Sequence, residues 1–240
     1  MPRIIIYDLD GTLLDTLGDL RGSVNYALRK MGWKERTLEE VRGFVGNGVH
    51  KLIERGVPEG TPKEDMERCF SYFQEHYLIH CQDTTDLYPG VREMLEEVHA
   101  RGILTAIVSN KLQAGVDELY DRFFHDVVDI AIGQREGVPL KPAPDMVNLA
   151  LSELEQIANH NSQCTYSSSP RGGKEGVFYV GDSEVDIETA RRAGLTCIAV
   201  LWGFRDREQL VQAGATNFIS RPEELIGSCN LSGRSHRDKP

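Results

Sequence analysis

An apolar, β-branched run that ends in two carboxylates is the feature that most constrains this chain. Residues 4–16 are IIIYDLDGTLLDT, so Asp8 and Asp10 follow directly after Ile4–Tyr7. Residues i and i+2 of a strand point to the same side, with Cα atoms about 6–7 Å apart. At an effective dielectric constant of about 20, two charges at that distance repel by roughly 2.5 kcal/mol. A bound cation or a proton on one carboxyl group relieves this repulsion, although Asp10-Gly11 alone is also typical of a simple turn.

Apolar runs of strand length alternate with helical patterns along most of the chain. The runs are near-continuous, as expected for parallel strands that are covered on both faces. They are Ile4–Tyr7, Ile103–Val108, Val127–Ile132, Val177–Val180 and Thr196–Leu201. Segments such as PGVREMLEEVHARG and SEVDIETARRAG between them have helical spacing. This order predicts an α/β protein, a Rossmann-like three-layer α/β/α sandwich with a parallel sheet.

One long segment interrupts the alternation of strands and helices. Residues 15–86 contain only helical periodicity, and about 70 residues are too many for a connection, so they predict an inserted α-helical cap domain. The core domain then comprises residues 1–14 and 87–227. The polar, Ser- and Gly-rich residues 159–176 predict a flexible loop within the core, and residues 228–240 predict a disordered tail.

The composition excludes some classes of partner and compartment. A formal net charge of −10 leaves no basic excess for phosphate backbones, so no nucleic-acid partner is expected. Five scattered cysteines without a C-x-x-C pair are typical of a reducing compartment. The first apolar run is too short for a signal peptide or a membrane span. We expect a cytoplasmic protein with no membrane contact that is a monomer or homodimer.

A second acidic group follows another predicted strand. In VFYVGDSEVDIETA, Asp182 comes after Val177–Val180 and one glycine, while Ser183 and Asp186 match a helix capping box. The capping box explains Ser183 and Asp186 but gives no role to Asp182. If the two strands are neighbours, Asp8 and Asp182 converge on one point, a hard-oxygen site suited to Mg²⁺.

Two further strand ends carry groups that suit an anion. AIVSNK places Ser109 and Asn110 just past Ile103–Val108, and LKPAPD places Lys141 before a helix. A polar turn and an exposed lysine are each ordinary features when taken alone. Together, four strand ends with complementary polar groups predict a ligand site at the carboxyl edge of the sheet.

The four segments together resemble the motifs of the haloacid dehalogenase superfamily of phosphohydrolases. DLDGTLLDT is similar to its first motif, VSNK to its second, KPAPD to its third and GDSEVD to its fourth, in the same order. The resemblance runs from Ile4 to about Leu225. A helical insert between the first and second motifs, with FVGNGVHKLIERG and WGF, is most similar to the phosphoglycolate phosphatase branch.

The resemblance implies a role for each motif residue. Asp8 would take the phosphoryl group as an aspartyl-phosphate, and Asp10 would protonate the leaving alcohol and then activate water. Asp8, Asp182 and the backbone carbonyl of Asp10 would hold Mg²⁺, and Asp186 would orient its water shell. The transferring phosphoryl oxygens would be bound by Ser109, Asn110 and Lys141.

The resemblance also leaves the substrate and the reaction open among several alternatives. The cap would close over the substrate, and Gly46, Asn47 and Gly48 either face the site or form a turn between two helices. A small phosphate monoester, with 2-phosphoglycolate foremost, is the expected substrate. A phosphosugar mutase of the β-phosphoglucomutase type and a pyrophosphatase share the core motifs. A phospho-acceptor signalling module is the alternative outside the enzymes.

Overall fold

The computed structural model describes residues 3–160 and 174–232. The chain divides into two compact units, which we describe separately. The core unit comprises Met1–Leu13 and Tyr88–Pro240, and the helical unit comprises Leu14–Leu87. Most of the predicted loop 159–176 lies outside the described residues. No helix in the described part of the chain is long and apolar enough to cross a lipid bilayer.

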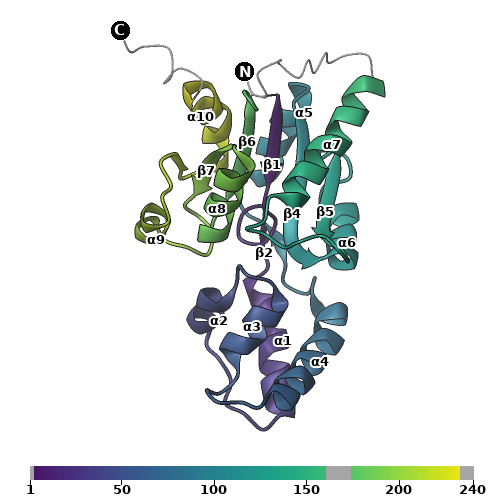
Figure 1. The fold of residues 1–240 in the computed structure, drawn as a ribbon, viewed down its shortest axis with the longest axis vertical. Coiled ribbons are helices and arrows are strands. Elements are labelled where there is room, and N and C mark those ends of the chain that lie inside the picture. Colours follow the sequence, from purple (N-terminus) through teal and green to yellow (C-terminus); the bar gives the residue numbers. More distant parts are fainter. Residues whose placement is uncertain (1–2, 161–173, 233–240) are drawn as a thin grey trace. The chain divides into compact units, whose positions relative to one another are not determined.

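A six-stranded sheet in the order β5-β4-β1-β6-β7-β8 is the centre of the core unit (Figure 1). Every pair of neighbouring strands in it is parallel. The strands are β1 (Ile4–Tyr7), β4 (Leu104–Leu112), β5 (Ile130–Gln134), β6 (Val177–Gly181), β7 (Thr196–Val200) and β8 (Phe218–Ile219). The first strand in the sequence thus lies in the middle, between the strands that carry the second and fourth motifs. This arrangement confirms the predicted parallel α/β sandwich.

Helices cover both faces of this sheet. Figure 1 shows α7 and α8 in front of the sheet and α5 behind it. The helices of the core unit are α5 (Val91–Ala100), α6 (Gln113–Phe123), α7 (Asp145–His160), α8 (Glu184–Ala193), α9 (Arg207–Gln212), the 3-10 turn η1 (Pro222–Glu224) and α10 (Leu225–Ser232). Gly194 in the left-handed conformation ends α8, as expected for a glycine just past a helix.

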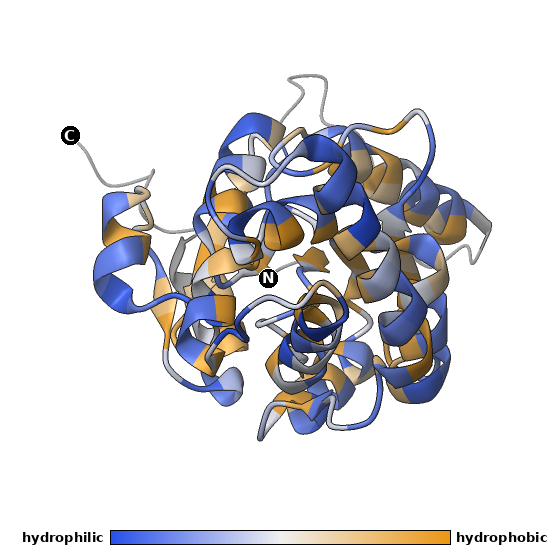
Figure 2. Ribbon diagram, turned by 90° about the horizontal axis from the view of Figure 1, so that it is seen from below, coloured by the Kyte–Doolittle hydropathy of each residue, from blue (hydrophilic) through white to orange (hydrophobic). Residues whose placement is uncertain are grey.

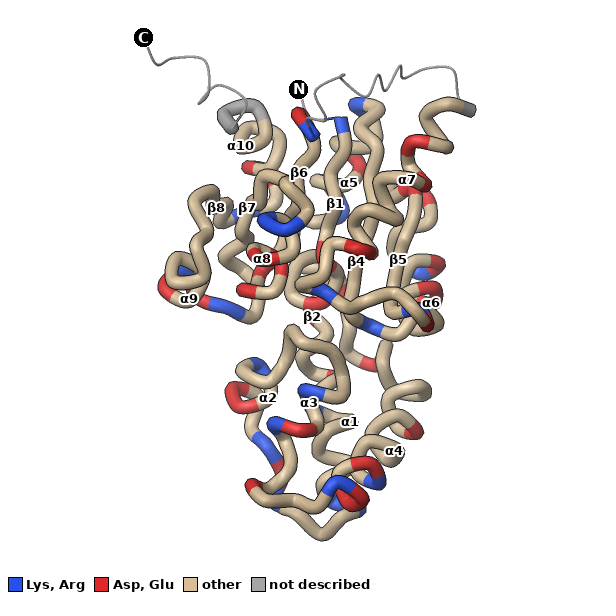
Figure 3. Tube along the Cα trace, viewed as in Figure 1, with Lys and Arg blue, Asp and Glu red and all other residues tan. Residues whose placement is uncertain are grey.

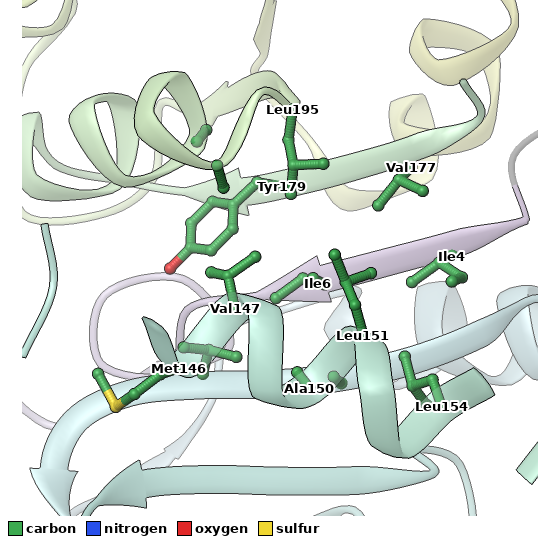
Figure 4. Packing of buried hydrophobic residues seen from close by; sticks show 14 of the residues in the cluster. Ile4, Ile6, Met146, Val147, Ala150, Leu151, Leu154, Val177, Tyr179 and Leu195 are labelled. Carbon is green, nitrogen blue, oxygen red and sulfur yellow. The ribbon is translucent and has the colours of Figure 1, made fainter. Parts of the chain in front are cut away.

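The packing between α7 and the sheet explains why the strands are apolar. Figure 4 shows Val147 and Leu151 of α7 against Ile4 and Ile6 of β1, with Tyr179 of β6 beside them. All of these side chains are buried in one cluster. All four residues of β1 are buried, so this strand carries no alternating polar positions.

The helical unit contains four helices and one short antiparallel strand pair. Its helices are α1 (Leu17–Lys30), α2 (Leu38–Phe44), α3 (Val49–Gly56) and α4 (Lys63–His80), and its strands are β2 (Leu14–Asp15) and β3 (Asp86–Leu87). Figure 2 shows hydrophilic and hydrophobic positions alternating along the helical ribbons, which is typical of amphipathic helices around a small core. The strand pair joins the two chain segments at which this unit begins and ends.

The structure differs from the sequence predictions in four places. The strand predicted at Val127–Ile132 is β5, which runs from Ile130 to Gln134. The strand predicted to end at Val108 continues as β4 to Leu112, because a bulge shifts its pairing with β5. Strand β8 has only two residues and no recognisable apolar run. Residues 228–232 of the predicted disordered tail belong to α10, with Cys229 buried, and residues 233–240 lie outside the described part of the chain.

Asp19 connects the first and last segments of the helical unit, and its removal tests that connection. This buried carboxylate accepts hydrogen bonds from the backbone N–H and the hydroxyl of both Thr84 and Thr85, at 2.6–3.1 Å. We expect Asp19→Asn to lower the free energy of unfolding by about 2–3 kcal/mol, because a buried acceptor becomes a donor facing donors. Urea unfolding measures this change.

Asp65→Asn is the matched control for that measurement. Asp65 forms an exposed ion pair with Arg68 on α4, so we expect its loss to change stability by less than about 0.5 kcal/mol. Equal effects of the two substitutions would show that the Asp19 hydrogen bonds do not stabilise the unit.

Candidate active site

The first and fourth motifs converge at the carboxyl edge of the sheet. Asp8 follows β1 directly and Asp182 follows β6, its parallel neighbour. The backbone N–H of Asp8 donates to the carbonyl of Val180 at 2.9 Å, which extends the ladder to the motif residue. One carboxylate oxygen from each of Asp8, Asp182 and Asp186 lies within 4.8 Å of the others.

Lys141 is the cation at the centre of this acidic group. Its Nζ lies 2.7 Å from Asp8 Oδ1 and 2.9 Å from Asp186 Oδ1, and its side chain is only 2% exposed. It also donates to the hydroxyl of Tyr179 at 3.0 Å, and that hydroxyl donates to Asp186 Oδ1 at 3.2 Å. Lys141 therefore joins the nucleophile candidate of the first motif to the last residue of the fourth.

The pKa values of Asp8 and Lys141 are raised for different reasons. Burial raises the pKa of Asp8 most strongly, and the charge of Asp186 adds to it, while Lys141 partly offsets both. Burial alone would lower the pKa of Lys141, but the charges of Asp186 and Asp8 outweigh it, so its pKa is raised well above the usual value. Lys141 thus stays an ammonium group at neutral pH despite its burial.

Asp186 is held by donors on both of its oxygens. Its Oδ1 accepts hydrogen bonds from Lys141 Nζ and from the Tyr179 hydroxyl. Its Oδ2 accepts from the backbone N–H and the hydroxyl of Ser183 at 3.1 and 2.6 Å. A methyl group at Gly181 would lie 2.3 Å from Asp186 Cβ, so only glycine fits there. Asp186 therefore serves two functions, the start of α8 and the fixed partner of Lys141.

Asp182 is oriented by the first motif and by the loop after β7. Thr12 Oγ1 donates to its Oδ1 at 3.2 Å, and the backbone N–H of Phe204 donates to its Oδ2 at 2.7 Å. Trp202 Nε1 donates to the carbonyl of Thr12 at 3.0 Å, which ties that loop to the first motif. A Cβ at Gly203 would lie 2.3 Å from Asp182 Cβ, so the WGF segment requires its glycine.

The pKa of Asp182 is raised to about 7. Burial is the main cause, and the neighbouring charge of Asp186 adds to it. The N–H of Phe204, the charge of Arg205 and the hydroxyl of Thr12 act in the opposite direction without balancing the other two. A cation at this point would restore the ionised carboxylate.

Asp10 faces a different cation, Lys111, which the sequence reasoning missed. Lys111 Nζ lies 2.9 Å from Asp10 Oδ1 and 3.2 Å from Oδ2, and its side chain is 5% exposed. The lysine stands in the VSNK segment, next to two residues that were singled out. Figure 3 shows charged positions of both signs at the lower ends of β1, β4 and β6.

The bulge in β4 explains why three successive residues of the second motif reach this region. Val108 pairs with Ile132 and Leu112 with Gln134, so the residues between them do not alternate as in a regular strand. Ser109 Oγ accepts from the N–H of Lys111 at 3.1 Å within the bulge. The prediction that Ser109 and Asn110 lie past the strand is therefore wrong, since both belong to irregular β4.

Asn110 has a defined structural partner in the third motif. Its Oδ1 accepts from the backbone N–H of Lys141 at 2.7 Å, and its Nδ2 donates to the carbonyl of Lys141 at 3.0 Å. These two bonds place the lysine backbone relative to β4. Its predicted contact with phosphate stays a prediction, as does that of Ser109.

The predicted substrate residues Gly46, Asn47 and Gly48 lie in the helical unit, between α2 and α3. Both glycines have positive φ values of 124° and 80°, and Gly48 is the N-cap of α3. Asn47 Oδ1 accepts from an Arg55 guanidinium N–H at 3.0 Å. These contacts match a turn between two helices, and the part of these residues in substrate binding stays a prediction.

Removing the central cation tests how much of the fold depends on it. We expect Lys141→Met to lower the free energy of unfolding by about 3 kcal/mol or more at pH 8, because Asp8 and Asp186 lose their shared partner. The double variant with Asp186→Asn should lose less than the sum of the two single variants. Urea unfolding of the four proteins measures this coupling.

Lys174→Met is the matched control for Lys141→Met. Lys174 lies before β6, at the opposite edge of the sheet, and donates to the carbonyl of Ala193 at 2.8 Å. Its Nζ also donates to Asn148 Oδ1 at 3.1 Å. We expect Lys174→Met to lower the free energy of unfolding by about 1–2 kcal/mol, as for the loss of two hydrogen bonds. Strictly additive effects of Lys141→Met and Asp186→Asn would contradict the ion pair.

Comparison with known proteins agrees with this geometry. The chain matches the family model of haloacid dehalogenase-like hydrolases over residues 5–200. A phosphoglycolate phosphatase of Pseudomonas putida is 30% identical over 239 residues, which cover 95% of this chain and 80% of that protein. One of Cereibacter sphaeroides is 32% identical over 212 residues, covering 85% and 87%.

A solved structure shows the same architecture. It is that of a proposed phosphoglycolate phosphatase from Lactobacillus delbrueckii subsp. bulgaricus, 30% identical, with a TM-score of 0.82 and coverage of 95% of this chain and 99% of that one. The resemblance inferred from the four motifs is confirmed. With a family model matched from residue 5 to residue 200, the chain belongs to the haloacid dehalogenase-like hydrolases.

Proposed function

We propose that the protein is a Mg²⁺-dependent phosphatase of small phosphate monoesters, with 2-phosphoglycolate as its substrate and an aspartyl-phosphate on Asp8 as its intermediate. One observation supports this above all: Asp8 and Asp10, two residues apart, each pair with a different buried lysine. Two carboxylates in separate electrostatic environments can take separate roles, one as nucleophile and one in proton transfer. The similarity to phosphoglycolate phosphatases supports the same reaction.

The donor set at the sheet edge fits a small divalent cation. Asp8 and Asp182 offer hard carboxylate oxygens, and the acidic group they form with Asp186 is buried. Asp186 is bonded through Oδ1 to the Lys141 ammonium group and through Oδ2 to Ser183 at the start of α8, whereas Asp182 accepts from the neutral Thr12 hydroxyl and Phe204 N–H. We therefore propose Asp182, together with Asp8, as the direct ligands. The bound ion would supply positive charge opposite the phosphate oxygens and hold the phosphoryl group in place.

Asp8 is placed to act as the nucleophile through one defined oxygen. Its Oδ1 accepts from Lys141 and from the N–H of Leu9, both at 2.7 Å, which leaves Oδ2 for phosphorus. In the first step Oδ2 forms a bond to phosphorus, and the bond from phosphorus to the ester oxygen breaks. Asp10 donates its proton to that oxygen, so the alcohol leaves neutral.

The second step returns the protein to its starting state. Asp10, now a carboxylate, accepts a proton from a water molecule whose oxygen attacks phosphorus. The bond between phosphorus and Asp8 Oδ2 breaks, and inorganic phosphate leaves. Lys141, held by Asp186 and Tyr179, stays beside the transferring group and opposes its negative charge throughout.

A substrate panel with Asp8→Asn tests reaction and nucleophile together. The panel holds 2-phosphoglycolate, β-glucose 1-phosphate, glucose 6-phosphate and pyrophosphate, each with Mg²⁺ or with a chelator. We expect phosphate release to be fastest from 2-phosphoglycolate, to need Mg²⁺, and to fall at least about 10⁴-fold in Asp8→Asn, as for loss of a nucleophile. Colorimetric phosphate detection measures it.

Asp126→Asn is the control for an unrelated carboxylate. Asp126 pairs with Arg92 on the surface of the core unit, so its change should leave turnover within about twofold. Turnover that persists in Asp8→Asn would exclude the aspartyl-phosphate. A rearranged phosphosugar in place of free phosphate would identify a mutase instead.

Metal binding should depend on pH because protons compete for Asp182. Its pKa of about 7 in the metal-free protein lies above that of an unfolded carboxyl, so its ionisation lowers folding stability as pH rises from about 4 to 7. The raised pKa of Asp8 likewise makes its ionisation unfavourable for the stability of the metal-free fold. We expect Mg²⁺ affinity to rise by up to about tenfold between pH 5.5 and 6.5, and to level off above pH 7.5.

Isothermal titration calorimetry at constant ionic strength measures this affinity. Mg²⁺ should raise the melting temperature more at pH 7.5 than at pH 5.5, since it removes the cost of the ionised carboxylates. Asp182→Asn should weaken binding and flatten its pH dependence. Affinity that stays constant from pH 5.5 to 7.5 would contradict the assignment of Asp182 as a ligand.

A further inference from the structure

We propose that Lys111 recognises a carboxylate on the leaving group of the substrate, so that the site selects phosphate monoesters of 2-hydroxy acids. The smallest member of this class is 2-phosphoglycolate. The proposal rests on the function proposed above and assigns its substrate selectivity to one residue of the core unit. It starts from a buried lysine that phosphoryl transfer itself does not require, because Lys141 already lies beside the nucleophile.

The ammonium group of Lys111 lies next to the point where the leaving group must be. Its Nζ contacts both oxygens of Asp10, at 2.9 and 3.2 Å. In the proposed reaction Asp10 hands its proton to the ester oxygen, so that oxygen lies within hydrogen-bond distance of the Asp10 carboxyl group. Asp10 would thus lie between the ester oxygen and Lys111, in contact with both. We infer that Lys111 faces the organic group attached to that oxygen.

The local backbone fixes Lys111 in this place. It belongs to the bulge of β4, where its N–H donates to Ser109 Oγ. A Cβ at Gly133 of β5 would lie 2.8 Å from the Lys111 carbonyl oxygen, so glycine is needed for the bulge to lie against β5. The stem of Lys111 lies against Gly115 of α6, 3.5 Å from where a Cβ on that glycine would be.

The chemistry of 2-hydroxy acids fits the position of this cation. In such an ester one carbon separates the ester oxygen from the carboxyl carbon, so a carboxylate oxygen lies about 3 Å from the ester oxygen. That spacing brings the carboxylate within reach of a cation that already contacts Asp10. An ammonium group carries three donors about a rotatable bond, so it can contact Asp10 and the substrate together.

The burial of Lys111 makes the contact selective. The side chain of Lys111 is only 5% exposed, so its ammonium group has lost part of its hydration shell. A carboxylate replaces that lost hydration with a strong, charge-assisted hydrogen bond, whereas a neutral group replaces it poorly. A charge-assisted hydrogen bond of this kind changes affinity by about 10- to 100-fold. If Lys111 served only as the counter-ion of Asp10, its loss would affect all substrates equally.

The first experiment compares two esters that differ only in the group facing Lys111. The pair is 2-phosphoglycolate and 2-hydroxyethyl phosphate, which has an alcohol in place of the carboxylate. We expect the native protein to prefer 2-phosphoglycolate by about 10- to 100-fold or more in kcat/KM, and Lys111→Met to reduce this preference below about threefold. Lys111→Arg, which keeps the positive charge, should keep most of it.

A binding experiment separates recognition from proton transfer by Asp10. The ligands are 3-phosphonopropionate and propylphosphonate, which cannot be hydrolysed and differ by the carboxylate, titrated calorimetrically with Mg²⁺ present. The native protein should bind the carboxylate ligand about 10- to 100-fold more tightly. That difference should vanish in Lys111→Met and persist in the control Lys174→Met, whose lysine lies before β6.

The outcomes separate this proposal from the proposed function. A native protein that binds the two phosphonates equally overturns it, whatever the variants do. So does a Lys111→Met protein that keeps the full preference, or one that loses activity equally on both esters with the ratio unchanged. If the native protein releases no phosphate from 2-phosphoglycolate but is active on other esters, the proposed substrate fails; preferential binding of the carboxylate phosphonate would then still support Lys111 as a carboxylate site.

Discussion

The buried ion pair that Lys141 forms with Asp8 and Asp186 is the interaction on which the rest of the site depends. Three charged side chains lie in a region from which water is excluded, and each would be costly without the others. Tyr179 and Asn110 complete the arrangement, one at the ammonium group and one at the lysine backbone. The contact joins Asp8 after β1 and Asp186 in the first turn of α8 to the loop before α7, so separating these motifs would break a buried ion pair.

Each of the two buried lysines pairs with a different carboxylate of the first motif. Lys141 pairs with Asp8, to which we assign phosphoryl transfer, and Lys111 pairs with Asp10, to which we assign the leaving group. The four carboxylates Asp8, Asp10, Asp182 and Asp186 still exceed the two ammonium groups in charge. Burial raises the pKa values of Asp8 and Asp182 most strongly, and the negative charge of Asp186 adds to the effect. The divalent cation that we propose at Asp8 and Asp182 would offset this negative charge and favour the entry of an anionic substrate.

Sequence reasoning reached the parallel sandwich because the relevant signals are local. The apolar runs of β1, β6 and β7 and the polar residues after them are visible in the order of residues alone. The end of β4 could not be predicted in the same way, because its bulge depends on Gly133 of the neighbouring strand and on a shift in pairing. Strand β8 was missed because two residues give no periodicity, and its place follows from pairing with β7.

The sequence by itself determined which chemical groups stand at the strand ends, since each motif is a contiguous stretch with a fixed spacing. Only the tertiary structure decided which of these groups are partners, because Asp10 and Lys111, or Lys141 and Asp186, are far apart in the chain. Lys111 shows the difference most clearly. Its side chain looks like an ordinary surface lysine in the sequence, and it becomes a buried cation beside Asp10 only because a bulge turns consecutive residues of β4 toward one edge of the sheet.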